Sequence, residues 1–501
     1  MEHIRPKIVA FLEDDENSFP APGKRDCVTK YKNKKQKHYL RDSLFNLHKK
    51  FILQTKIKIS FATFYRCKPF WITRRKISSR DTCLCKKHAN FTFLFEKCKL
   101  YKFLSQKSLT EFIESLTCDK NNKNCMYGDC TLCQDRLLFD QGTLNKSEKL
   151  FFYEWVTEPE DRIVKGKEVK VKVTKKIKKY CTVEQLMEKL KSSLLEFLQH
   201  AYRVWHQLSF SKNLKSTIKL NEIFMTIDFS ENAVLKYAEE TQSVHFGASK
   251  QQLTLHTGGF YYKTDVDSPP SVKTFCSIST SLRHDPSAIW AHLLPIFEKI
   301  KTEFPQVDTV HIMSDGPTTQ YRNKKNFFLF EYFMKKYNFS KATYNFSECG
   351  HGKSIADGVG GLIKRTADQA VAHGKDVHDI ETFVDTVKHT KTEVFVIQED
   401  QITVMDKLFP EHNLKAIPQT MKLHQLAWSI NNEYRFNLRA LSCLRCRNEY
   451  ECCHFTSLQK KFFSFQLQDD DCILLINYVC LRYQLFFLFI TCRNKLCFET
   501  M

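Results

Sequence analysis

The sequence predicts an α+β protein, and three observations lead to this class. Between residues 222 and 372, segments with the alternating polarity of strands and segments with the period of amphipathic helices follow one another. Upstream, helical patterning and clustered cysteines predict a helical, cysteine-rich N-terminal region. The chain has 501 residues, of which 42% are hydrophobic and 13% aromatic. That composition excludes global disorder and provides for two or three domains with cores of their own.

The charge balance favours a polyanionic partner. Lys and Arg number 77 against 56 Asp and Glu, for a formal net charge of +21. Nucleic acid is the first candidate and an anionic membrane surface the second, while a merely solvated basic surface is the alternative. The N-terminus "MEHIRPKIVAFLEDDENSFP" lacks the apolar centre of a signal peptide. We therefore expect an intracellular protein, whose 20 cysteines are metal ligands or buried thiols.

Residues 1–80 are rich in lysine and predict a basic helical region. An apolar stripe at helical spacing is formed by Leu40, Leu44, Leu47 and Phe51. A second short helix is expected to begin near Ser60, whose hydroxyl can cap it, and to end before Pro69. Two short helices in a basic setting predict a remnant of a helix-turn-helix, and an ordinary helical packing unit is the alternative.

Residues 81–135 carry a constellation of zinc-ligand residue types. Its members are Cys83, Cys85, His88, Cys118, Cys125, Cys130 and Cys133. Thiolate and imidazole suit a tetrahedral zinc site, and the C-x-x-C pair at 130 and 133 can bring two sulfurs to one ion. Reduced structural thiols are the alternative.

Residues 136–215 are predicted to be a basic linker followed by a long helix. In "KGKEVKVKVTKKIKKY", residues 165–180, lysines alternate with apolar residues, which fits a strand with one charged face or an exposed linker. Such a segment can lie along phosphates. Thr182 and Gln185 predict a capping box at the start of the following amphipathic helix.

Residues 222–372 form the most informative region. The order of predicted elements is β-β-β-α-β-α-β-α, which is the order of the ribonuclease H-like fold. In that fold the first and fourth strands lie side by side. The first strand, "EIFMTIDFS", is expected to end near Asp228, and the fourth, "VDTVHIM", leads to Asp315 before a turn at Gly316-Pro317. We therefore expect these two aspartates to meet at one edge of the sheet.

A third carboxylate would complete a site for two divalent ions. The start of the last helix supplies Asp357, and the end of the preceding strand supplies Glu348 as the reserve. Two Mg²⁺ or Mn²⁺ ions held by hard oxygen ligands can activate a nucleophile and stabilise the leaving oxygen of a phosphodiester. Under the alternative interpretation, Asp228 and Asp315 only end strands and cap helices.

Basic residues next to these acids are candidate phosphate contacts. They are His351, Lys353, Arg322 and Lys324. The segment "SECGHGKS" also resembles a phosphate-binding P-loop, but Ser347 stands where that motif requires glycine. A nucleotide hydrolase is therefore the remote alternative.

The C-terminal part adds a second cysteine cluster and an apolar tail. Residues 373–455 predict a strand, a helix and a further strand, without assigned chemistry. A weaker zinc set follows, formed by Cys443, Cys446, Cys452, Cys453 and His454. Residues 456–501 are hydrophobic and are interpreted as a docking helix or a non-native extension. A membrane span at 472–492 is disfavoured by Arg482 in its middle.

Several motifs together resemble a known family. "DFSEN", "SDGPTTQYRNK", "GHGKSIADGVGGLIKR", "PGKRD" and "CMYGDCTLC" are similar to motifs of uncharacterised, transposon-derived proteins of animal genomes, and the resemblance spans about residues 8–455. It implies a DDE-type transposase core, domesticated or decayed. Asp228 and Asp315 match the family's first two acids, and Asp357 matches a position where relatives also have an acid. Some relatives lack an acid equivalent to Glu348.

The function that follows is metal-dependent DNA cleavage and strand transfer in the nucleus. We expect DNA as the partner and Mg²⁺ or Mn²⁺ as cofactor, with structural zinc in the cysteine clusters. No small-molecule substrate and no membrane are expected, and a homo-oligomer is left open. The alternative is a catalytically inactive DNA-binding or scaffold protein that inherited the fold.

Overall fold

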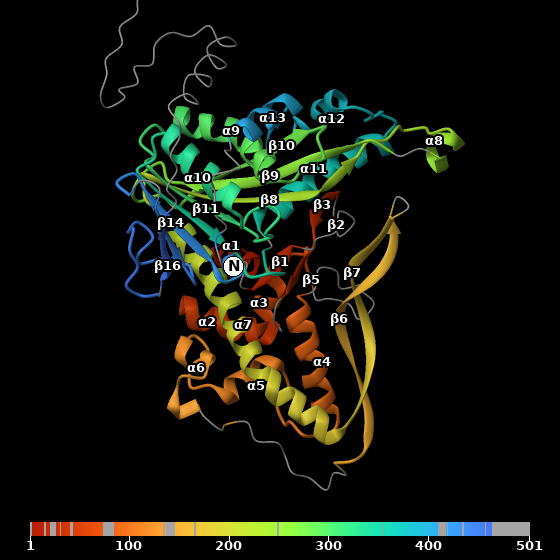
Figure 1. Cartoon of the computed structure of the whole chain (residues 1–501), viewed down its shortest axis with the longest axis vertical. Helices are drawn as coiled ribbons and strands as arrows, with labels where there is room; N and C mark the ends of the chain where they lie inside the picture. Colours follow the sequence, from red (N-terminus) through yellow and green to blue (C-terminus); the bar gives the residue numbers. More distant parts are fainter. Residues whose placement is uncertain are drawn as a thin grey trace, which may run out of the picture.

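A mixed sheet of nine strands dominates the described part of the computed structural model (Figure 1). The residues described are 3–14, 17–20, 27–30, 32–40, 44–73, 85–133, 136, 146–164, 167–247, 250–352, 354–408, 417, 419–432, 435–455 and 457–462. The strands of the sheet are β8 (Glu222–Val234), β9 (Gln252–Tyr262), β10 (Ser271–Ser279), β11 (Thr309–Ser314), β12 (Lys341–Phe346), β13 (Glu393–Val396), β14 (Gln425–Ser429), β15 (Arg435–Arg439) and β16 (Ser457–Phe462). The protein is therefore α+β, as predicted.

The order of strands across the sheet is β13-β10-β9-β8-β11-β12-β14-β15-β16. Strands β8, β9 and β10 are antiparallel neighbours, whereas β11 lies parallel to both β8 and β12. The expected adjacency of the first and fourth core strands is thus confirmed. Strand β13 joins β10 in parallel, and β14 to β16 extend the other side antiparallel. The described strands after residue 373 therefore belong to the same sheet.

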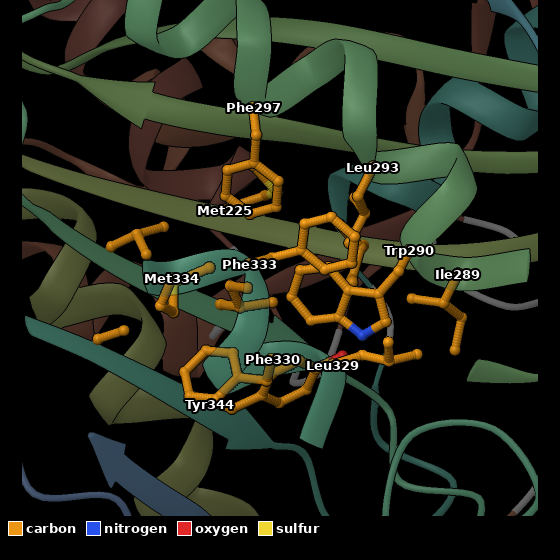
Figure 2. Close-up of a cluster of buried hydrophobic side chains, with 14 of the residues drawn as sticks. Met225, Ile289, Trp290, Leu293, Phe297, Leu329, Phe330, Phe333, Met334 and Tyr344 are labelled. Atoms are coloured by element: carbon orange, nitrogen blue, oxygen red, sulfur yellow. The ribbon is translucent and has the colours of Figure 1, made fainter. Parts of the chain in front are cut away.

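Helices cover both faces of this sheet. Helices α9 (Pro286–Glu303), α10 (Lys324–Lys336) and α13 (Glu399–Lys407) contribute to one apolar core, and α11 (Ile355–Ala372) and α12 (Ile380–Val387) to another. Figure 2 shows the first core, in which the rings of Trp290 and Phe333 stack with centroids 5.0 Å apart. The indole Nε1 of Trp290 donates to Asn326, so its polar atom is satisfied in the interior.

A helix of 35 residues, α7 (Val183–Thr217), connects the sheet to the cysteine-rich unit. The predicted capping box is confirmed, because Thr182 accepts from the Gln185 amide and Gln185 accepts from the Thr182 amide. The cysteine-rich unit contains α4 (Lys86–Leu100), α5 (Leu109–Leu116), α6 (Lys123–Tyr127) and the short 3-10 helix Thr131–Cys133. Near its C-terminal end α7 packs Phe210 and Leu214 against Phe224 and Met313 of the sheet.

The basic segment before α7 is a strand, not a linker. Strands β6 (Lys149–Val164) and β7 (Lys167–Thr182) form a long antiparallel hairpin that lies beside α4 and extends away from the main sheet (Figure 1). The alternation of lysine with apolar residues therefore reflects the two-residue period of a strand.

The first 80 residues differ from the helical region that we expected. Three helices are present, α1 (Ile4–Glu13), α2 (Leu44–Thr55) and α3 (Phe61–Cys67). They are joined by five short strands, β1 (Ser18–Pro20), β2 (Cys27–Lys30), β3 (Asn33–Gln36), β4 (His38–Leu40) and β5 (Ile72–Thr73). Ser60 caps α3 by accepting from the Thr63 amide, as predicted. Leu40 was expected in a helix but ends β4, because it pairs with Ser18 of β1. This pairing between strands decides its conformation, although its spacing fits a helical pattern.

One strand boundary in the core also differs from the prediction. Strand β8 continues past Asp228 because β9 still pairs with it there, Asp228 opposite Thr257. Helix α10 begins at Lys324, since Asn323 caps it in an extended conformation and the preceding residues form a turn. A short helix, α8 (Gln242–Gly247), and a 3-10 turn at Thr420–Lys422 complete the described elements.

Among the described helices, none is both long and apolar enough to cross a membrane. The apolar stretch at 472–492 lies outside the described residues, as does the rest of the tail after residue 462.

Candidate functional site

Three aspartates from three elements form an acidic cluster. The parallel register of β8 and β11 pairs Thr226 with Met313, so Asp228 and Asp315 follow two positions later on the same face. Asp357 lies in the first turn of α11, where its carboxylate accepts from the amide of Ser354 at 2.9 Å. The sheet and one helix terminus thus bring together residues that are 129 positions apart at most.

The first turn of α11 is held close to β8. The hydroxyl of Thr257 lies 3.2 Å from the carbonyl oxygen of Asp228 and 3.0 Å from that of Ala356. Gly360 faces Ser230 so closely that an added Cβ would lie 2.3 Å from the serine Oγ. Glycine is therefore needed for the approach of helix to strand, which places Asp357 beside the other two acids.

Burial and neighbouring aspartates raise the pKa values of Asp228 and Asp315. Burial, followed by the charges of Asp315 and Asp357, raises the pKa of Asp228 well above its ordinary value. Burial also raises the pKa of Asp315 to about 6; Arg322 opposes this rise and Asp357 adds to it. One carboxylate oxygen of Asp315, Oδ1, is buried without a hydrogen-bond partner among the described residues. The protein offsets the negative charge of this cluster poorly. Carboxylate oxygens are the type of ligand that hard divalent cations prefer.

The structure corrects the role expected for Glu348. Its carboxylate accepts from His200 Nδ1 at 2.8 Å and from His424 Nε2 at 2.7 Å, with Arg203 Nε at 3.2 Å. Burial opposes ionisation, but the hydrogen bonds from His200 and His424 hold the pKa of Glu348 well below its usual range. Because its carboxylate is engaged by these cations and imidazoles, Glu348 is not the third acid.

Arg322 is turned into the interior of the protein. It is 4% exposed, and its guanidinium donates to the carbonyl oxygens of Ser347 at 2.8 Å and Met421 at 3.1 Å. It thus links the loop after β12 to the chain before β14. Lys324 is the partly exposed first residue of α10, and its phosphate contact stays a prediction. Lys353 lies outside the described residues.

Two lysines near the acidic cluster were missed by the sequence analysis. Lys212 and Lys215 of α7 line a pocket together with Thr226 and Met313, the residues two positions before Asp228 and Asp315 on the same face. The sequence shows that the two lysines are three positions apart on one predicted helix. The meaning of this spacing was hidden, because only the packing of α7 on the sheet brings these lysines to this pocket, where Lys212 pairs with Asp14 at 3.3 Å.

The predicted cysteine constellation separates into two sites. Cys85 and His88 converge with His200 and His351, and the four ligand atoms lie within 4.8 Å of one another. His351 is therefore part of a Cys/His cluster instead of the expected phosphate contact. His200 had not been proposed as a ligand, and no spacing signal connects it to the others. Cys83 lies outside the described residues.

Two further clusters agree more closely with the predicted sets. One contains Cys118, Cys125, Cys130 and Cys133, and the other contains Cys443, Cys446, Cys452 and His454. In the latter, Cys453 lies outside the set of four, although its Sγ is 3.2 Å from His454 Nδ1. Sulfur and imidazole donors at this separation can hold a metal such as zinc.

The fold and these sites define a class: an α+β protein with Cys/His clusters that can hold a metal and a partly buried cluster of aspartates. Residues 207–440 match the family described as Domain of unknown function (DUF8701), and residues 1–76 match Domain of unknown function (DUF8699). No curated protein and no solved structure matches the chain. The longer match contains the aspartates, Glu348 and His351, but ends before Cys443 and begins after His200.

Proposed function

We propose that the chain is a transposase-like protein whose core is ribonuclease H-like and ancestrally cleaves and joins DNA with two divalent ions. The observation that carries the proposal is the convergence of Asp228, Asp315 and Asp357, each from a different element, with the pKa values of Asp228 and Asp315 raised. Mg²⁺ or Mn²⁺ held there would supply the activation of a water or 3′-hydroxyl and the stabilisation of the leaving oxygen.

The strand order supports this choice of fold. Read from β10, the order is β10-β9-β8-β11-β12, with β9 antiparallel to its neighbours and β11 and β12 parallel to β8. Helix α9 connects β10 to β11, α10 connects β11 to β12, and α11 follows β12. This is the arrangement in which a ribonuclease H-like core places its acids.

The basic surface of the β6–β7 hairpin supports DNA as the partner. Its exposed lysines on β7 are Lys170, Lys172, Lys175, Lys176, Lys178 and Lys179. Aromatic rings lie beside them: the Nζ of Lys176 is 4.7 Å from the ring centre of Tyr153, and that of Lys178 is 5.1 Å from Phe151. Cations bind the phosphate backbone, and exposed aromatic rings can stack on unpaired bases. A nuclear location and self-association on DNA belong to the same proposal.

A P-loop hydrolase is not favoured by the packing of the glycine loop. An added Cβ at Gly352 would lie 2.8 Å from Ser347 Oγ, and one at Gly350 would lie 3.1 Å from Cys85 Cβ. Protein side chains thus approach the loop closely where a P-loop encloses phosphates. The catalytically inactive DNA-binding protein is the alternative that the experiment must separate.

The test compares wild type with Asp315→Asn on labelled and supercoiled DNA in Mg²⁺ or Mn²⁺. We expect nicking or strand transfer by wild type. The rate should fall at least about 100-fold in the variant, because Asn keeps the shape of the side chain but removes the negative charge that would bind the metal ions. Asp267→Asn, in an exposed turn, is the matched control and should retain activity. DNA binding without any metal-dependent product in folded, full-length wild type would refute the enzyme and support the inactive binding protein.

A further inference from the structure

The cluster of Cys85, His88, His200 and His351 has the geometry of a tetrahedral metal site. Cys85 Sγ lies 3.2 Å from His200 Nε2, and His88 Nδ1 lies 3.0 Å from His200 Nε2 and 3.2 Å from His351 Nε2. Zinc–nitrogen bonds of about 2.0–2.1 Å in a tetrahedron place neighbouring nitrogens about 3.3 Å apart. These three separations are close to that value, and all four ligand atoms lie within 4.8 Å of one another.

The contact partners of His200 also fit a metal ligand. His200 Nδ1 faces the carboxylate of Glu348 at 2.8 Å and donates to it. Its other ring nitrogen, Nε2, is directed at Cys85 Sγ and His88 Nδ1. A zinc ion would satisfy all of these donor atoms together. A carboxylate behind a ligating histidine is a common outer partner that fixes the ring and its tautomer.

Glu348 is itself fixed from two further sides. His424 Nε2 lies 2.7 Å from its second oxygen, and Arg203 Nε lies 3.2 Å from the same atom. The cluster therefore has a prepared outer shell contributed by α7, by the loop after β12 and by the start of β14. Buried side chains that bind no metal would not need this arrangement.

The same loop connects the cluster to the acidic site. Ser347 donates its amide to the Ser314 carbonyl at 3.0 Å, which ties the start of the loop to the end of β11. Gly350 packs on Cys85, and an added Cβ at Gly352 would lie 3.1 Å from Asp315 Cβ. His351 stands between these two glycines. An ion that holds His351 therefore holds the backbone that contacts Asp315.

We propose that Cys85, His88, His200 and His351 bind one Zn²⁺ ion that positions the loop of residues 347–352 against Asp315. The zinc is a positioning metal: it fastens the cysteine-rich unit, α7 and this loop to one another and so controls the assembly of the acidic site. The role of the acids rests on the proposed function, whereas zinc binding and the order of the loop do not.

The first measurement is zinc content of the purified full-length chain by elemental mass spectrometry. Three Cys/His clusters are present in the described residues, so Cys85→Ser is expected to lower the content by one equivalent relative to wild type. His351→Ala should do the same and serves if Cys85→Ser does not fold. Cys349→Ser is the matched control, because Cys349 is exposed in the same loop and outside the cluster. Unchanged zinc in both cluster variants would overturn the site.

The second measurement is amide hydrogen exchange over residues 347–352. Loss of the ion should speed exchange there at least about 10-fold in Cys85→Ser, with little change in Cys349→Ser, because a loop without its anchor opens locally. Loss of zinc with unchanged exchange would overturn the positioning role. Mn²⁺ binding, followed by electron paramagnetic resonance, then separates the two proposals. Failure of wild type to bind Mn²⁺ refutes the two-metal site, while zinc content and exchange still decide this inference.

Discussion

Neutralising Asp315 should stabilise the protein in the absence of divalent cations. In the folded chain this carboxylate is partly buried, lies near two others and has one oxygen without a partner among the described residues. Asp315→Asn keeps the shape of the side chain and removes the charge. The substitution that abolishes the proposed chemistry should therefore make the fold more stable, as expected of a site whose geometry serves a ligand.

The magnitude follows from the pKa of Asp315, which rises from 3.8 to about 6 on folding. At about 1.4 kcal/mol for each pH unit, this rise corresponds to a destabilisation of about 3 kcal/mol when the group is fully ionised. The folded pKa is the higher one, so the penalty is absent below about pH 4, grows toward pH 6 and is complete above it. Relaxation around the new amide reduces the gain, and we expect about 1–3 kcal/mol at pH 8.

Calorimetric melting at pH 8 and pH 4.5, in buffer without divalent cations or chelators, measures this effect. The variant should melt at least about 3 °C above wild type at pH 8. The difference should shrink at pH 4.5, where wild-type Asp315 is protonated. Added Mg²⁺ should raise the melting temperature of wild type only, because a ligand stabilises the state that binds it.

Asp267→Asn provides the control, since an exposed substitution should change stability by less than about 0.5 kcal/mol. An Asp315→Asn protein that melts at or below the wild-type temperature at pH 8 would refute the electrostatic reasoning. So would an equal gain at both pH values, since that gain could not come from ionisation of this carboxyl.

Two further predictions concern the fold. Phe333→Ala should destabilise the core by about 3–5 kcal/mol, because the ring is fully buried and stacks on Trp290. Urea unfolding followed by Trp fluorescence measures this loss. Leu53→Ala, at an exposed position, should have almost no effect. Thr182→Ala should cost about 1 kcal/mol by removing the cap of α7. Amide hydrogen exchange at the first turn of α7 checks the Thr182→Ala prediction. Thr182→Ser keeps the hydroxyl, so exchange as fast as in Thr182→Ala would contradict the prediction.

Local patterns predicted much of the secondary structure correctly. The capping hydroxyls of Ser60 and Thr182 accept from amides three residues away, so a short stretch of sequence is enough to predict their role. The order of strands and helices from residue 222 likewise follows from their periods. It led to the adjacency of the first and fourth strands, which the register of β8 and β11 confirms.

The ends of strands and helices were harder to predict where pairing between strands decides the conformation and the local hydrophobic pattern does not. Strand β8 continues past Asp228 because β9 is long enough to pair with it, which is a property of the partner. The helical spacing that included Leu40 fails because this residue pairs with Ser18. In both cases hydrogen bonds to another segment decide the conformation.

The sequence by itself determined most of the cysteine ligand candidates and the order of elements that brings Asp228 and Asp315 to neighbouring strands. Only the tertiary structure decided how the remaining candidates are grouped. His88, His200 and His351 are separated by 112 and 151 positions, and α7 and one loop bring them together. Glu348 and Arg322 turned inward for the same reason. Short-range periods and caps act within a few residues, whereas contacts between distant segments depend on how whole elements pack.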